Sequence, residues 1–456
     1  MDPTHEFFLS KGFVKFMKNI FSLIILMLCT LMGGCKTNVA KTEINGPSSE
    51  ITLPKPSSTL IPTVNIARAT SWPEGVKPVA KNGFSVSLFA KDIDHPRWIY
   101  KLPNGDILVA QSNKPSTNSV HGVKGVISNY FMKRAGAGLE SPDKITLLRD
   151  TKKIGVADVK SDFLTDLHSP FGMTLIGQDL YVANTDAVFR YHYEPDDLVI
   201  NTKKYPPEKF VDLPAGETNY HWTKNIIASP DHQKIYITVG SNSNVAEKGL
   251  DQENNRAAIL VLDLNTRKLE VFASGLRNPN GLAWDRNGKL WTVVNERDEL
   301  GDNLVPDYLT QVSEGDFFGW PYYYFGKNID PRIKDLEDKN YNVKVPNYAL
   351  GAHVAALGLA FADASNFSDF YRDGVFISEH GSWNRIPKSG YKVVFIPFKD
   401  GLPHGKPIDI LTGFLSEDDA AYGRPVGLQI DAIGNLLIAD DVGNKVWRVW
   451  QNNTKK

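Results

Sequence analysis

One pattern of apolar and polar residues returns along most of the 456-residue chain. An apolar run is followed by a short turn that usually contains Gly, and then by a second run rich in Leu, Ile, Val and Tyr. The copy at 98–110 has Asn104-Gly105 at its turn. Short apolar runs bounded by such turn residues are typical of β-strands joined in hairpins. The pattern therefore predicts a chain built from antiparallel strand pairs.

Further copies of this strand–turn–strand unit are spread over the chain, at 172–183, 225–239, 279–294, 357–378 and 426–439. Additional apolar runs follow several copies, as at 258–263 and 392–397. Six diverged copies of a four-stranded unit predict an all-β fold, a six-bladed β-propeller. The copies are spaced more widely than the ~40–50 residues of a typical blade. We therefore expect long inserted loops, gathered on one face above the central channel.

Composition and charge agree with an all-β fold and exclude some functions. Aromatic residues make up 11% of the chain, and Gly and Pro are plentiful. The formal net charge of -1 provides no field that would recruit nucleic acid. No long amphipathic helical period occurs, and no Gly-x-Gly-x-x-Gly motif opens a helix, which argues against a nicotinamide-binding fold.

The N-terminus has the pattern of a bacterial lipoprotein signal. A basic start at 17–19 precedes an apolar run at 20–31 and two glycines before Cys35. The run is too short for a comfortable membrane-spanning helix. A plain secretory signal and a short anchor helix are the alternatives. The signal predicts lipidation of Cys35, removal of Cys29 and an upstream extension at 1–16.

The expected domain organisation follows from this signal. Residues 1–35 form the signal peptide with its extension, 36–65 a tether without secondary structure, and 66–452 the propeller. Lys36, rather than Asp, follows the lipidated cysteine. We therefore expect an exported protein, anchored by lipid in the outer membrane and facing the periplasm. The only two cysteines lie in the signal region, so no disulfide framework is expected.

The segment 275–321 combines a hairpin with an unusual acidic loop. The loop carries four carboxylates within seven residues, namely Glu296, Asp298, Glu299 and Asp302. Oxygen ligands beside arginines are suited to binding Ca²⁺ together with an anionic ligand. The spacing is not that of an EF-hand, so a solvated acidic turn remains the alternative.

Several motifs of this segment resemble the glucose/sorbosone dehydrogenase family, sugar dehydrogenases that use pyrroloquinoline quinone (PQQ). They are Leu-Arg-Asn-Pro-x-Gly-Leu-Ala at 276–283, Asn-Gly-Lys-Leu at 287–290 and Gly-Trp-Pro at 319–321. The acidic loop is similar to that of the sorbosone and PQQ-dependent pyranose dehydrogenases. The resemblance extends, with gaps, over 72–449. It implies a six-bladed propeller that oxidises an aldose, pyranose or sorbosone-like sugar with PQQ and Ca²⁺.

The resemblance also implies a general base. His221 precedes a predicted strand, and a histidine is suited to proton transfer near neutral pH. Taken alone, it would more often be a histidine bonded to the backbone. The family's catalytic base stands at this point, although Tyr220 replaces an Asp found in the soluble glucose dehydrogenases. Lys224 follows closely in the sequence. It could pair with a quinone oxygen or a carboxylate, and a solvated surface lysine is the alternative.

Further cofactor contacts are implied by the same resemblance. Arg277 and Asn278 match a pair that contacts PQQ, whose three carboxylates require a positive, donor-rich pocket. Arg277 would also stabilise the negative charge that develops on the quinone; a salt bridge to the acidic loop is its alternative. Arg385 follows a predicted strand at a position where the family has a cationic cofactor contact. Arg424 and Asp440 match the last blade, where the family has an Arg and an Asp at the cofactor. In the family the loop's backbone carbonyls also bind the calcium.

Three further histidines, His168, His353 and His380, are the next candidates for the base; the first two are expected to be structural. The chain has no haem-attachment Cys-x-x-Cys-His, so reoxidation would need an external electron acceptor. A gluconolactonase-type propeller hydrolase that uses calcium and a non-enzymatic binding propeller remain as alternatives to the dehydrogenase.

Overall fold

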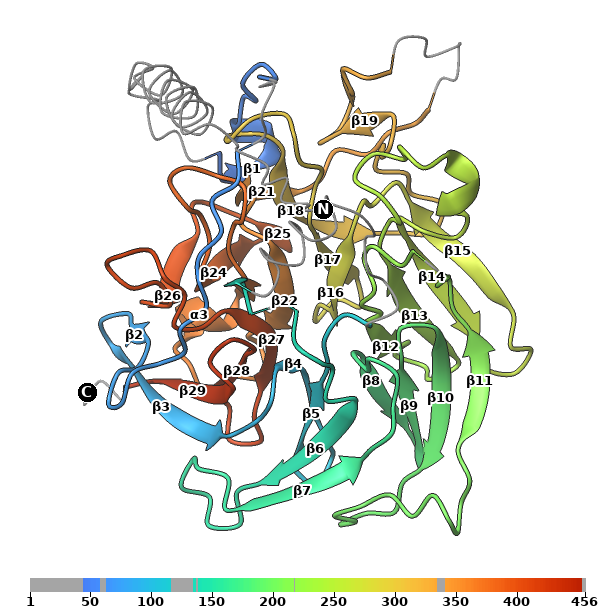
Figure 1. Ribbon diagram of the computed structural model, residues 1–456, viewed down its shortest axis with the longest axis vertical. Helices are drawn as coiled ribbons and strands as arrows, with labels where there is room; N and C mark the ends of the chain where they lie inside the picture. The colour runs from blue at the N-terminus through green and yellow to red at the C-terminus, as the bar shows by residue number, and fades with distance from the viewer. Residues whose placement is uncertain are drawn as a thin grey trace, which may run out of the picture. The chain divides into compact units, whose positions relative to one another are not determined.

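The computed structural model describes residues 44–57, 63–115, 134–136, 138–216, 218–333 and 341–452. All of them belong to one compact unit, which extends from Glu43 to Lys456. Six antiparallel sheets of four or more strands surround a centre, and the innermost strand of each sheet faces that centre (Figure 1). The predicted six-bladed β-propeller is confirmed.

The first three blades follow the chain in order. Their strands, from the inside outward, are β4 (Pro96–Lys101), β5 (Ile107–Gln111), β6 (Lys144–Arg149) and β7 (Val159–Leu164); β8 (Met173–Ile176), β9 (Asp179–Ala183), β10 (Ala187–His192) and β11 (Glu208–Asp212); and β12 (Ile226–Ala228), β13 (Lys234–Val239), β14 (Ala258–Asp263) and β15 (Leu269–Ser274).

The last three blades carry small additions. Their strands are β16 (Pro279–Trp284), β17 (Leu290–Val294), β18 (Pro306–Val312) and β21 (Tyr348–Ala352); β22 (Ala356–Phe361), β23 (Gly374–Glu379), β24 (Lys392–Lys399) and β26 (Ile408–Thr412); and β27 (Pro425–Ile430), β28 (Leu436–Asp440), β29 (Lys445–Gln451) and β3 (Phe84–Lys91). The additions to these blades are β1 (Gly46–Pro47), β2 (Val79–Ala80), the pair β19 (Tyr323–Tyr324) and β20 (Asn328–Ile329), β25 (Leu402–Pro403), and the short helical turns η1 (Ser48–Glu50) and α3 (Asp369–Arg372). One further turn, η3 (Leu250–Glu253), lies between β13 and β14 of the third blade.

The six predicted strand–turn–strand units are the two inner strands of the six blades. The ring closes through a pairing that the pattern did not reveal. Strand β3, which precedes the first blade, forms the outer strand of the last blade and pairs with β29 from Lys91↔Lys445 to Phe84↔Gln451. The two ends of the propeller are thus held together by backbone hydrogen bonds.

The core lies between neighbouring blades, because the middle strands are buried on both faces. In β17, Trp291 and Val293 pack against residues of the fifth blade such as Val375. The alternate residues Leu290 and Val294 face the opposite side and join the cluster that includes Ile259 of the third blade. Successive side chains of a strand point to opposite faces, so an unbroken apolar run fills two interfaces at once.

The predicted tether is wrong at 46–50, where β1 and the turn η1 form. Strand β1 pairs with the outer strand β21 of the fourth blade. Ile51 and Leu53 pack against that blade's apolar cluster. The segment lacks an apolar period because it is an extended chain that follows an existing sheet edge, and such pairing leaves little local pattern.

The predicted signal peptide, with Cys35, lies outside the described residues. Within the described part of the chain, no helix is long and apolar enough to cross a membrane.

Strand direction determines where the site lies. Each inner strand begins, and each second strand ends, at the same end of its blade. The loops before inner strands and after second strands therefore meet at one end of the channel. All predicted cofactor and catalytic residues lie on these loops, or at the strand ends beside them.

Candidate functional site

His221 lies in the loop that enters β12, and its orientation is fixed. Its Nδ1 is 2.7 Å from the carbonyl oxygen of Ser241 and 3.1 Å from the Ser241 hydroxyl. A carbonyl oxygen only accepts, so Nδ1 carries the hydrogen and the lone pair of the neutral ring is on Nε2. Burial, followed by the charge of Arg277, holds the pKa of His221 well below its usual value. The imidazole is therefore a neutral proton acceptor near pH 7.

A glycine lets His221 and Asn278 approach each other. A Cβ at Gly240 would lie 2.3 Å from Asn278 Oδ1 and 2.5 Å from the His221 Cβ. Only glycine fits between them without displacing one of the two. Asn278 Oδ1 is buried and has no partner among the described residues. The structure thus brings together two residues that the sequence placed in one site.

Arg277 is held more tightly than the sequence indicated. Its five N–H groups are directed at five protein acceptors, which are the carbonyls of Asn244 (3.3 Å), Asn295 (3.4 Å) and Glu296 (2.7 Å), Asn244 Oδ1 (3.0 Å) and Asp298 Oδ2 (3.1 Å). Its side chain is 4% exposed. The salt bridge that the sequence left as an alternative is present, and it fixes a positive charge close to His221.

Asp298 connects Arg277 to two other loops. Its Oδ1 accepts a hydrogen bond from Asn384 Nδ2 at 2.8 Å and lies 3.4 Å from His353 Nδ1. Burial opposes ionisation of this carboxyl, but Arg277 and His353 outweigh it and hold its pKa well below the usual range. In turn, Asp298 raises the pKa of His353 against the effect of burial. His353 is therefore a structural ion-pair partner.

The side chains of the four predicted calcium ligands do not converge on one point. Glu296 is buried, which raises its pKa to about 7, and accepts from its neighbour's backbone N–H at 3.0 Å. Glu299, with a φ of 71°, is exposed, and Asp298 is committed to Arg277. Asp302 contributes only its carbonyl, to Arg385. No group of three His, Cys, Asp or Glu in the described ranges could hold a metal ion.

Lys224 supports the loop that carries His221. Its side chain is 0% exposed, and Nζ donates to the carbonyls of Trp222 at 3.2 Å and His221 at 3.4 Å. Burial and the charge of Arg256 hold its pKa well below the usual value. The alternative of a surface lysine is wrong. A direct contact with a cofactor would require this side chain to leave its buried position.

Two further predicted cofactor residues have structural roles. Arg385 donates to the carbonyls of Asp302 at 2.8 Å and Pro387 at 2.7 Å, and so ties two loops together. Asp440 is 0% exposed, and burial raises its pKa to about 6. Its acceptor positions are filled by four donors, the indoles of Trp72 (2.6 Å) and Trp447 (2.9 Å) and the backbone N–H groups of Arg424 (2.8 Å) and Gly443 (2.9 Å).

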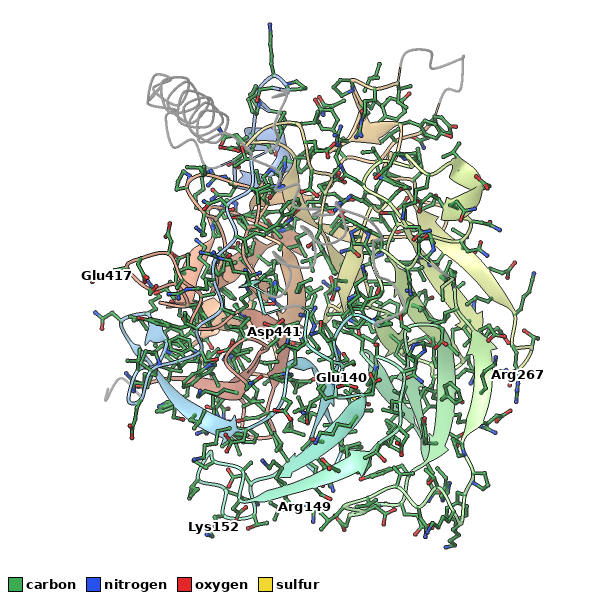
Figure 2. The ribbon with its side chains drawn as sticks, in the orientation of Figure 1. Glu140, Arg149, Lys152, Arg267, Glu417 and Asp441 are labelled. Carbon is green, nitrogen blue, oxygen red and sulfur yellow. The ribbon has the colours of Figure 1, made fainter. Side chains whose placement is uncertain are left out.

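The next residue, Asp441, is the centre of a group of which the sequence analysis selected only His380. Its Oδ2 binds Arg97 Nη1 and lies 2.9 Å from His380 Nε2 and 3.8 Å from His95 Nε2. Its backbone N–H donates to the carbonyl of Arg424 at 3.3 Å. Figure 2 shows Asp441 near the middle of the ring, whereas Arg149 and Arg267 lie at the rim.

One signal in the sequence could have found this group. A residue followed by Pro opens three of the six inner strands, as His95-Pro96, Asn278-Pro279 and Arg424-Pro425. Asn278 and Arg424 were selected, and their equivalent in the first blade was not.

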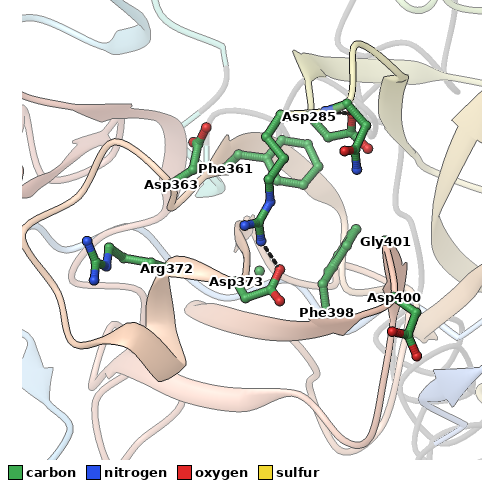
Figure 3. A pocket seen from close by; sticks show the side chains of 11 residues that line it. Asp285, Phe361, Asp363, Arg372, Asp373, Phe398, Asp400 and Gly401 are labelled. Atoms are coloured by element: carbon green, nitrogen blue, oxygen red, sulfur yellow. Dashed lines mark hydrogen bonds and ion pairs between the residues drawn. The ribbon is translucent and has the colours of Figure 1, made fainter.

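A separate hollow of about 500 Å³ lies at the other ends of the strands (Figure 3). It is formed by turns of the fourth and fifth blades, and its lining includes Asp285, Phe361, Asp373 and Phe398. An ion pair between Arg286 and Asp373 crosses it. None of the predicted site residues lines it.

Comparisons with known proteins agree with the fold and the motifs. The family model described as TrAA12-like matches residues 78–314 and 324–452. An uncharacterized protein of Borreliella burgdorferi is 31% identical over 293 residues, which are 62% of this chain and 76% of that protein. The PQQ-dependent pyranose dehydrogenase of Coprinopsis cinerea is 23% identical over 430 residues, covering 80% of this chain and 53% of that protein. The chain thus spans about half the length of that relative.

Two solved structures have the same fold. The holo PQQ domain of the Coprinopsis cinerea pyranose dehydrogenase has a TM-score of 0.64 at 21% identity, covering 84% of this chain and 99% of that domain. The calcium structure of a Trichoderma reesei enzyme of carbohydrate-active family AA12 has a TM-score of 0.62 at 18% identity, covering 85% and 99%. The resemblance that the motifs indicated is confirmed.

Proposed function

This chain belongs to the TrAA12-like family, and from that premise we propose that it oxidises a sugar with PQQ as its cofactor. The sequence relative with a named activity is a PQQ-dependent pyranose dehydrogenase, which supports a pyranose or a related sugar as the substrate. The overall reaction removes a hydride from a sugar carbon and a proton from its hydroxyl. PQQ, when bound, supplies the acceptor for the hydride.

The observation that carries the proposal is the state of His221. The hydrogen on Nδ1 is held by the carbonyl of Ser241, so Nε2 is the atom that takes the hydroxyl proton. The adjacent positive charge of Arg277 disfavours the protonated ring, yet it stabilises negative charge that develops near it. Because its five donors are already bonded, Arg277 acts as a fixed charge, with Asn278 beside it.

The remaining residues fit a ligand with several carboxylates. Buried side chains around the channel include donors without a partner among the described residues, such as Arg97 Nε, Arg424 Nε and Asn113 Nδ2. An anionic, hydrogen-bonding ligand would satisfy such groups. The side chains do not fit a calcium site built from the acidic loop, so no step of the proposal depends on Ca²⁺. An external acceptor would return the cofactor to its oxidised form.

Single-turnover reduction of bound PQQ tests this function. The wild-type protein, loaded with PQQ, should lose quinone absorbance when mixed with one or more members of an aldose and sorbosone panel. His221→Gln should bind PQQ with unchanged affinity and react ~10²–10⁴-fold more slowly. His232→Gln, in an exposed turn at the other end of its blade, is the matched control. A parallel run with EGTA measures any requirement for Ca²⁺.

The same assay separates the alternatives. If no sugar reduces the quinone in the wild-type protein, the dehydrogenase proposal fails. Hydrolysis of a sugar lactone with Ca²⁺ alone would then support the hydrolase. A His221→Gln protein that reduces PQQ at the wild-type rate would remove His221 from the reaction and leave His380 as the next histidine to test.

A further inference from the structure

A buried arginine that the sequence analysis did not select lies near His221. Arg256 is 6% exposed and precedes β14, in the blade whose entering loop carries His221. Its Nη2 donates to the carbonyl of Ala215 at 2.8 Å and to Asn219 Oδ1 at 3.0 Å, and its Nη1 donates to the carbonyl of Gly240 at 3.3 Å. One side chain thus binds two separate segments of the chain.

These two segments are the ones that hold the proposed base. The first two acceptors belong to the loop at 213–225, which carries His221. The third, Gly240, precedes Ser241, whose carbonyl oxygen fixes the hydrogen on His221 Nδ1. Gly240 also separates His221 from Asn278. A guanidinium that spans both loops therefore fixes the position of the ring relative to the carbonyl that orients it.

Asn219 connects Arg256 to the backbone beside the base. Its Nδ2 donates to Thr185 Oγ1 at 2.8 Å, and the Thr185 hydroxyl donates to the carbonyl of Trp222 at 2.9 Å. Asn219 and Thr185 are both buried, and hydrogen bonds that are shielded from water restrain side chains strongly. The network therefore begins at Arg256 and ends at the residue that follows His221.

The charge of Arg256 is not needed to make these bonds. Within the described part of the chain its acceptors are three neutral oxygens, and no carboxylate forms an ion pair with it. Burial lowers the pKa of the guanidinium, which nonetheless stays charged in proteins. A charge buried against neutral acceptors costs stability. Buried charges are concentrated at functional sites, where a fixed field is useful.

We propose that Arg256 is a positioning residue for the base, because it fixes the His221 ring in the orientation that presents Nε2 to the substrate hydroxyl. It acts through Asn219 and the Gly240 carbonyl, and it is assigned no contact with substrate or cofactor. The inference rests on the proposed function, in which His221 takes the hydroxyl proton.

The charge of Arg256 makes a second contribution, which depends on the other groups around His221. These groups are Tyr220 and Lys224 of the same loop, Arg256 before β14, Arg277 before β16 and Asp298 after β17. Burial lowers the pKa of His221 most, Arg277 and Arg256 lower it further, and Asp298 opposes the two arginines. Loss of the Arg256 charge should therefore raise the pKa of His221.

Two substitutions separate geometry from charge. Arg256→Gln removes the charge together with the planar fork. Arg256→Lys keeps the charge, but an ammonium on a flexible stem cannot reproduce the fork that reaches both loops. Arg267→Gln is the matched control, because Arg267 follows the other end of β14 and its side chain is 46% exposed.

Nuclear magnetic resonance of the full chain with labelled histidine measures both properties without cofactor or sugar. The signals of His221 are identified by their loss in His221→Gln. In the wild-type protein the ring should be the Nδ1–H tautomer, with a pKa below its ordinary value. Both Arg256 variants should show a mixture of the two tautomers, because the bond to the Ser241 carbonyl is no longer fixed. The pKa of His221 should rise in Arg256→Gln and stay low in Arg256→Lys. Arg267→Gln should match the wild type.

Single-turnover reduction of PQQ measures the consequence for the reaction. Arg256→Gln and Arg256→Lys should each react about 10- to 100-fold more slowly, because a displaced base is misaligned with the hydroxyl. The acidic limb of the pH–rate profile should move to higher pH in Arg256→Gln alone. A residue that only stabilised the fold would change neither the tautomer nor this limb.

The two measurements distinguish the possible failures. A wild-type tautomer and pKa of His221 in both Arg256 variants would overturn the proposal. Mixed tautomers in variants of a protein that oxidises no sugar would show that Arg256 fixes the ring, while the proposed oxidation fails.

Thr185→Val keeps the test decisive if the Arg256 variants do not fold. It removes the hydroxyl that joins Asn219 to the Trp222 carbonyl and leaves the Arg256 charge in place. The ring of His221 should then show mixed tautomers at an unchanged pKa. A single tautomer in Thr185→Val would overturn the proposed network.

Discussion

At the scale of single residues, the protonation state of His221 predicts a pH profile. Its folded pKa is held well below 6.5 by burial and Arg277, and only the neutral ring accepts a proton. The rate of PQQ reduction should therefore be level near neutral pH and fall as the pH drops through this lowered pKa. Single-turnover rates from about pH 4 to 8 check this, and His221→Gln should lose the acidic limb.

A pH–rate profile of another shape would identify a titrating residue other than His221. Burial raises the pKa of Glu296 to about 7. If the wild-type rate rises through neutral pH instead of staying level, a group with such a pKa controls the reaction. Glu296→Gln would then abolish that limb, and the assignment of His221 as the titrating base would be contradicted.

At the scale of structural elements, the predictable features are those encoded locally. The six strand pairs were predictable because the two apolar runs of each pair and the turn residues between them follow one another directly in the sequence. The pairings of β3 with β29 and of β1 with β21 join distant segments, and their sequences contain no sign of the partner. The local pattern therefore did not predict long-range pairing. This includes the pairing of β1 with β21, which lies in the expected tether.

The same distinction applies to the site. The sequence located the loops correctly because they flank recognisable strands. It did not establish where side chains in those loops point. Lys224 is buried and donates to two backbone carbonyls. Asp440 accepts hydrogen bonds from indole and backbone donors, and Glu299 is exposed. Directions in irregular loops depend on contacts with other loops, which no local pattern records.

The N-terminal segment allows a test at this scale. The backbone N–H of Asn65 donates to the carbonyl of Trp383, and its side chain bonds the Arg385 carbonyl and Lys388 Nζ, both at 2.8 Å. Asn65→Ala removes both side-chain bonds and should lower the free energy of unfolding by about 1–3 kcal/mol. It should also speed backbone hydrogen exchange in residues 383–388. A segment that only packed against this loop, without bonding to it, would leave that exchange rate unchanged.

Chemical denaturation and hydrogen exchange measure these effects. Asn265→Ala, in an exposed turn of the third blade, is the control and should change the free energy of unfolding by less than about 0.5 kcal/mol. Equal stability and exchange in the wild-type and Asn65→Ala proteins would mean that the segment lies on the propeller without restraining the loop of Arg385.

At the scale of the whole molecule, the remaining question is how the propeller is held in the cell. We propose a lipid anchor at Cys35. The apolar run at 20–31 is shorter than the ~20 residues that a spanning helix needs, so membrane attachment would depend on the acyl chains. Several acyl chains anchor a protein stably, whereas one binds only marginally.

Fractionation of cells that express the full chain tests this anchor with a matched pair of cysteines. Cys35→Ala should move the protein from the membrane fraction to the soluble fraction, because the lipid attachment site is lost. Cys29→Ala should leave it in the membrane fraction, because that residue would be removed with the signal. If the Cys35→Ala protein stays with the membranes, the 20–31 run itself must hold it there, and the lipoprotein proposal is contradicted.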